Sequence, residues 1–110
     1  MEILYPNQKV QKLFSEEKKL KAEFGHLAKS IQRRLTQIEA AETLATLNKE
    51  MPGSRIHEYK GGDKGKLSID LTGNYRLIFR PNDPPPLKED GGLDWSKITE
   101  IVILKVIDPH

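Results

Sequence analysis

The sequence predicts an α+β domain with the element order β-α-α-β-β-β-β, in which two N-terminal helices pack on one face of a mostly antiparallel sheet. Two observations predict this fold class. Apolar residues recur at helical spacing through the first half of the chain, and after Pro52 the period falls from 3.6 to 2, as in strands. A length of 110 residues suits one core, so we expect residues 1–110 to form a single domain.

The N-terminal half combines a short strand with helical periodicity. The opening MEILY favours a strand that ends before Pro6, and Asn7 and Ser15 are both suitable helix N-caps. An apolar stripe with spacings of 4, 3, 4, 4 and 3 predicts one long amphipathic helix through Leu20, Phe24, Leu27, Ile31, Leu35 and Ile38. Gly25 should weaken this helix by about 1 kcal/mol relative to alanine. A second, shorter helix should end at Pro52.

The C-terminal half favours strands. The predicted strands cover residues 55–59, 66–71, 75–80 and 98–107. Thr72-Gly73-Asn74 is a tight connection, so the strands on either side of it should form a β-hairpin. Residues 82–96 contain three consecutive prolines and should form a long loop, with Trp95 as its hydrophobic anchor.

The segment GNYRLIFRP, residues 73–81, divides its side chains between two faces of a strand. Tyr75, Leu77 and Phe79 should pack on the helical stripe, together with alternate residues of 101–107. The opposite face holds Arg76, Ile78 and Arg80. Two interpretations of these arginines stay open: a solvated face with pairing to Asp70 across the hairpin, or a phosphate site, because a guanidinium can donate two hydrogen bonds to one phosphate.

Basic residues gather around this hairpin. The whole chain has a net charge of +2, but residues 55–80 hold six basic and three acidic side chains, which favours a localised anion site. His57 lies in this region, although a lone histidine is more often a packed or surface residue than a catalyst. The Gly61-Gly62-Asp63 turn lacks the spacing of a nucleotide-binding loop, so a nucleotide cofactor is not expected.

Composition excludes several classes of protein. Without cysteine the chain has no disulfide or thiolate metal site, and no pair of histidines has metal-ligand spacing, so we expect no metal and no cofactor. The chain lacks both a secretory signal and an apolar run of about 18 residues. We therefore expect a cytoplasmic protein with no membrane partner.

Several short motifs follow one another in a family-specific order. The segment PGSRIHEYKGGDKGKLSIDLTGNYRLIFRP, residues 52–81, contains Ile-His-x-x-Lys-Gly, a Gly-Asp-basic-Gly turn, a Ser-Ile strand and Asn-Tyr-Arg-apolar-x-Phe. The chain then closes with Asp-Pro-His, where the family has Asp-Tyr-His. In these motifs it resembles the HigB-like branch of the RelE/ParE superfamily of type II toxin–antitoxin systems. The resemblance implies a RelE-like fold, similar to compact microbial ribonucleases.

The resemblance also implies function. Many members of this branch are endoribonucleases that cleave messenger RNA in the ribosomal decoding site, and a HigA-like helix-turn-helix antitoxin binds them. The implied partners are therefore mRNA, the ribosome and this antitoxin. The family's catalytic residues fall on His57, Lys60, Arg76, Asp108 and His110. On charge alone, Lys64, Lys66 and Arg80 are added as ligands of RNA phosphates.

These residues suit metal-free RNA cleavage, which needs a base, an acid and cations around the developing negative charge. His57 and His110 are the acid–base pair, since histidine alone has an unperturbed pKa near neutrality; which of them is the base stays open. The stabilising cations would be Lys60, Arg76 and Arg80. Asp108 could orient an imidazole. Pro109 replaces the family's tyrosine, so the site lacks a ring that could stack on a base or supply a proton.

Two alternative functions remain at this point. A ParE-like toxin that poisons DNA gyrase would need no pair of histidines, and the presence of both favours the nuclease. A catalytically degenerate RNA-binding protein is compatible with proline in place of the family's tyrosine.

Overall fold

A computed structural model of the chain describes residues 1–51, 56–59 and 65–108, and the structural statements below concern these residues. The predicted α+β class is confirmed. The elements are β1 (Glu2–Leu4), α1 (Gln8–Ser15), α2 (Glu17–Phe24), the 3-10 helix η1 (Gly25–Leu27), α3 (Ala28–Ala40), α4 (Leu44–Glu50), β2 (His57–Glu58), β3 (Leu67–Asp70), β4 (Arg76–Pro81), the 3-10 helix η4 (Trp95–Lys97) and β5 (Glu100–Ile107).

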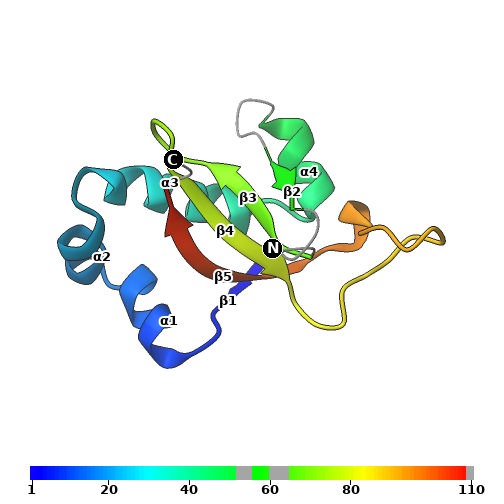
Figure 1. The fold of residues 1–110 in the computed structure, drawn as a ribbon, viewed down its shortest axis with the longest axis horizontal. Coiled ribbons are helices and arrows are strands. Elements are labelled where there is room, and N and C mark those ends of the chain that lie inside the picture. The colour runs from blue at the N-terminus through cyan, green and yellow to red at the C-terminus, as the bar shows by residue number, and fades with distance from the viewer. Residues whose placement is uncertain (52–55, 60–64, 109–110) are drawn as a thin grey trace.

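The strands form one mixed sheet with the spatial order β1-β5-β4-β3-β2 (Figure 1). Only β1 runs parallel to its neighbour within the described residues, so the sheet is mostly antiparallel as predicted. The β3–β4 hairpin pairs Leu67 with Phe79 at one end and Asp70 with Arg76 at the other. Gly73 closes it with a φ of 67°, a conformation that glycine adopts without steric cost.

The predicted long helix is wrong in one respect. It is divided into α2 and α3 at Gly25, whose φ is 55° and whose ψ is −122°, far from helical values. The chain passes through η1 before α3 begins, and the apolar stripe continues across the break. Asn7 is the N-cap of α1, where its side chain accepts a hydrogen bond of 2.9 Å from the amide of Val10. Ser15 is not an N-cap but the last residue of α1.

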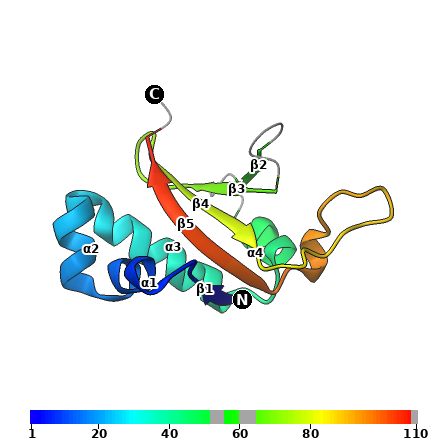
Figure 2. The same cartoon turned by 60° about the horizontal axis from the view of Figure 1, so that its bottom comes forward.

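The helices pack on one face of the sheet, and their apolar stripe meets the hairpin there (Figure 2). Leu77 and Phe79 are fully buried in this core, as predicted. The predicted alternation along residues 101–107 is wrong beyond Ile103. A β-bulge passes over Leu104, because Phe79 pairs with Ile103 while the preceding Ile78 pairs with Lys105.

The bulge shifts the phase of β5 by one residue. Before it, Ile101 and Ile103 face the core; after it, Val106 packs against the core, while Lys105 and Ile107 share the opposite face with their partners on β4. A strand without the bulge would place Lys105 among the buried helix side chains. The bulge therefore moves a cation to the face that no described helix covers.

The predicted loop 82–96 is more ordered than its prolines suggested. It folds back on itself through a bridge between Leu87 and Leu93 and a 2.9 Å hydrogen bond from the amide of Asp94 to the carbonyl of Pro86. Trp95 packs against the core, which confirms its predicted role as the anchor. The loop extends beyond one end of the sheet (Figure 1). In the described part of the chain, no helix has the length and apolar character needed to cross a membrane.

Candidate functional site

The face of the sheet opposite the helices brings several predicted residues together. Residues paired directly across neighbouring strands point to the same face. The register therefore places one row of side chains across β2, β3, β4 and β5: His57, Ser68, Ile78 and Lys105. An exposed imidazole and an exposed ammonium group thus lie on either side of a buried centre.

Arg76 lies two residues along β4 from this row and pairs with Asp70 and Ile107. Its Nε is 3.6 Å from Asp70 Oδ1, an ion pair too long for a hydrogen bond. The pairing with Asp70, one of the two interpretations that the sequence left open, is therefore present in the structure. On the helix side, Arg34 donates a 2.9 Å hydrogen bond to the Asp70 carbonyl. Burial and the neighbouring Arg33 lower the pKa of Arg34, and the Asp70 carboxylate opposes this.

Arg80 lies at the other end of β4, where it pairs with Val102. Its Nη1 donates to the carbonyl of Pro81 at 3.2 Å and to Oδ2 of Asp83 at 3.5 Å. Four residues along a strand separate the Cα atoms of Arg76 and Arg80 by about 13 Å. Because each guanidinium also pairs with a carboxylate at its own end, the two arginines mark opposite ends of the face.

The centre of this face is apolar. Ile78 and Val102 are 2% and 3% exposed although they lie on the side away from the helices. A cavity of about 90 Å³ lies over the centre, lined by Tyr59, Lys66, Ile78, Lys105 and Ile107. The hydroxyl groups of Tyr59 and Ser68 are buried, and neither has a hydrogen-bond partner among the described residues. Buried polar groups of this kind are uncommon and costly.

The structure describes five of the eight predicted site residues. His57, Lys66, Arg76 and Arg80 belong to the face, and Asp108 is exposed directly after β5, next to the pair formed by Arg76 and Ile107. The remaining predicted site residues, Lys60, Lys64 and His110, and also Pro109, lie outside the described residues. In residues 1–51, 56–59 and 65–108, no three His, Asp or Glu side chains gather as metal ligands.

The predicted site did not include three residues of this face: Tyr59, Ser68 and Lys105. Alternation in the sequence places Ser68 opposite the core residues Leu67 and Ile69, and alternation with His57 would have placed Tyr59 on this face. No local signal identifies Lys105, because simple alternation from Ile101 places it on the wrong face.

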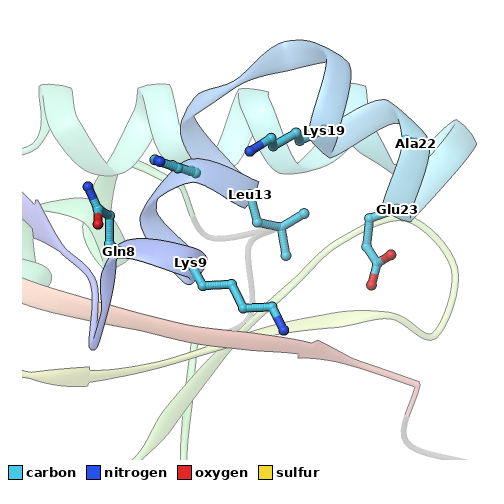
Figure 3. A pocket seen from close by; sticks show the side chains of 7 residues that line it. Gln8, Lys9, Leu13, Lys19, Ala22 and Glu23 are labelled. Carbon is cyan, nitrogen blue, oxygen red and sulfur yellow. The ribbon is translucent and has the colours of Figure 1, made fainter.

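A separate groove of about 630 Å³ lies between α1 and α2 (Figure 3). Its lining residues are Gln8, Lys9, Lys12, Leu13, Lys19, Ala22 and Glu23. None of the predicted site residues lines it, so it is not part of the face described above. Its lysines are exposed, and Lys19 pairs with Glu16 at 3.5 Å.

Comparison with known protein families identifies the family of this chain. The family model of the RelE-like toxin of the type II toxin–antitoxin system HigB matches residues 4–85, which is more than half of the chain. The chain belongs to the HigB-like toxin family. No curated protein matches the chain.

Family membership identifies this HigB-like protein as the toxin of a type II toxin–antitoxin module, which implies an antitoxin partner. The matched range contains His57, Arg76 and Arg80 but stops before β5. Lys105 and the predicted Asp108 and His110 therefore lie beyond the family match.

Proposed function

We propose that this HigB-like toxin is an endoribonuclease that cleaves messenger RNA on the ribosome, in the cytoplasm, and thereby inhibits translation. A HigA-like helix-turn-helix antitoxin would restrain it. The observation that carries the proposal is the row across the helix-free face, in which the His57 imidazole and the Lys105 ammonium group lie on either side of buried Ile78.

The distribution of charge along β4 suits a single RNA strand. The Cα atoms of Arg76 and Arg80 are about 13 Å apart along β4, so we assign the two side chains to two different phosphates of one RNA chain. The nucleic acid would run along β4, with a phosphate over Ile78 between them. Lys66 and Lys105 add positive charge beside this path.

The proposed reaction needs no resident cofactor. The 2′-hydroxyl loses its proton to a base and attacks the adjacent phosphorus, while an acid protonates the departing 5′-oxygen. The products are a 2′,3′-cyclic phosphate and a 5′-hydroxyl end. We assign the base and acid roles to His57 and His110, stabilisation of the phosphorane-like charge to Lys60 and Arg76, and orientation of an imidazole to Asp108.

Inducible expression with global mapping of mRNA 5′ ends tests this function. We expect growth arrest, new 5′-hydroxyl ends phased with codons, and recovery when the neighbouring small DNA-binding protein is co-expressed. DNA breaks trapped on gyrase would instead identify a ParE-like activity. Growth arrest with neither cuts nor breaks would leave an RNA-binding protein without catalysis, and normal growth at high expression would contradict an active toxin.

A further inference from the structure

The helix-free face continues past the end of β4 into a second cavity of about 310 Å³. Its described lining residues are Gly65, Lys66, Arg80, Pro81, Asp83, Pro85 and Leu93. Lys66 also lines the smaller cavity over Ile78, so the two cavities adjoin. One wall of the second cavity comes from the sheet and the other from loop 82–96.

The two cations of this second cavity lie on its sheet side, whereas its loop side carries apolar Pro85 and Leu93 together with the carboxylate of Asp83. Lys66 and Arg80 come from the sheet, and Arg80 is positioned by its hydrogen bonds to Pro81 and Asp83. Pro85 and Leu93 form an apolar wall on the loop side. A nucleotide has the same division, because its phosphate is anionic and its base presents an apolar face.

The apolar wall is held in place by the loop's own structure. Leu93 forms the bridge with Leu87, and the Asp94 amide that follows donates to the Pro86 carbonyl at 2.9 Å. Trp95 then packs against the core. Leu93 is therefore held between the bridge to Leu87 and the anchored ring of Trp95. Binding of a base against Leu93 requires little further ordering of the loop.

We propose that this second cavity binds the base of a nucleotide next to the one whose phosphate lies over Ile78. The base packs against Pro85 and Leu93, and its phosphate contacts Lys66 and Arg80. The volume of about 310 Å³ is at the small end of ligand sites, as a single nucleotide requires. This inference rests on the proposed RNA-cleaving function and assigns loop 82–96 to substrate positioning.

An abasic scan tests the subsite directly. The probe is a fluorescent single-stranded RNA of about eight nucleotides, fully 2′-O-methylated so that its 2′-oxygens cannot attack. One base at a time is removed, and the affinity of the full-length protein is measured by anisotropy. In the unmodified protein, loss of one particular base should weaken binding by about 5-fold, the low end of the range for base stacking on an aromatic ring, because Pro85 and Leu93 are aliphatic.

Two leucines of the loop provide a matched pair of variants. Leu93→Ala should abolish the penalty at that position, whereas Leu87→Ala, whose residue is 55% exposed and does not line the cavity, should retain it. Pro85→Ser provides a second test if Leu93→Ala lowers stability, and it should also reduce the penalty.

The outcomes separate this inference from the function on which it rests. RNA binding with no base-sensitive position, or with a penalty unchanged in Leu93→Ala and Pro85→Ser, would overturn the subsite and leave the RNA-binding face intact. Failure of the unmodified protein to bind the probe even at low salt would overturn the RNA-binding face and the subsite together, and the mapping of mRNA 5′ ends would then decide separately whether the protein cleaves RNA on the ribosome.

Discussion

Arg76 and Asp70 face each other across the β3–β4 hairpin, with Arg76 Nε and Asp70 Oδ1 3.6 Å apart. The pair has two consequences for a phosphate-binding face. Asp70 orients the guanidinium, but it also neutralises part of the charge that would attract RNA.

The first prediction therefore concerns Asp70→Asn, which removes the charge and keeps the shape. RNA affinity should rise several-fold at low salt, and the gain should shrink at high salt because it is electrostatic. The free energy of unfolding should fall by only about 0.2–1 kcal/mol, the usual contribution of a partly exposed ion pair. Anisotropy titrations at two salt concentrations, with urea denaturation, measure both effects. A loss of affinity at low salt would show that orientation of Arg76 outweighs its neutralisation.

The second prediction concerns the core. Leu77 and Phe79 are fully buried on the helix side of β4, so Leu77→Ala or Phe79→Ala should lower the free energy of unfolding by about 2–5 kcal/mol. The exposed Leu87 is the control, and Leu87→Ala should change stability by less than about 0.5 kcal/mol. Chemical denaturation of the three variants measures these changes in the free energy of unfolding. Equal effects of the buried and exposed substitutions would contradict the assigned face of the hairpin.

The third prediction concerns His57, which is exposed on β2 in the row with Ile78. His57→Ala should lower the rate of mRNA cleavage on purified ribosomes by about 10²–10⁴-fold, as for loss of a general acid or base. His26 is an exposed histidine in η1 on the helix side, so His26→Ala should cleave at the normal rate. Because both side chains are exposed, neither variant should lose much stability. Normal cleavage by His57→Ala would remove this residue from the acid–base pair.

The fourth prediction concerns Ser68, the buried polar residue at the centre of the helix-free face. Its Oγ lacks a described hydrogen-bond partner, so Ser68→Ala should raise the free energy of unfolding by about 1 kcal/mol. Ser96 is the control, because its hydroxyl donates to Asp94 at 2.5 Å. Ser96→Ala should therefore leave stability unchanged or lower it.

Denaturation curves of the two serine variants test this difference. If Ser68→Ala gained stability and lost cleavage, the Ser68 hydroxyl would contribute to cleavage of the substrate and not to the stability of the fold. A lower free energy of unfolding for Ser68→Ala than for the unmodified protein would show that the Ser68 hydroxyl has a hydrogen-bond partner in solution.

Local patterns in the sequence determined the fold class and the division of the hairpin into two faces. Alternation along residues 75–80 assigned Leu77 and Phe79 to the core and placed Arg76 and Arg80 on the opposite face, because side-chain direction in a strand depends only on the parity of the position. The cap at Asn7 was also readable, since the capped amide is three residues away. The helical stripe identified its core residues correctly even though it did not reveal the break at Gly25.

Only the tertiary structure decided which residues complete the candidate site. Lys105 reaches the helix-free face because a bulge at Leu104 shifts the register of β5 against β4, two strands that are separated in the chain by residues 82–99. Arg80 meets loop 82–96 because that loop folds back between Leu87 and Leu93 beside the end of β4. Register and loop docking are settled by the packing of distant segments against each other. Alternation within one strand assigns side chains to faces, but it does not show where a bulge interrupts the strand or where a loop packs.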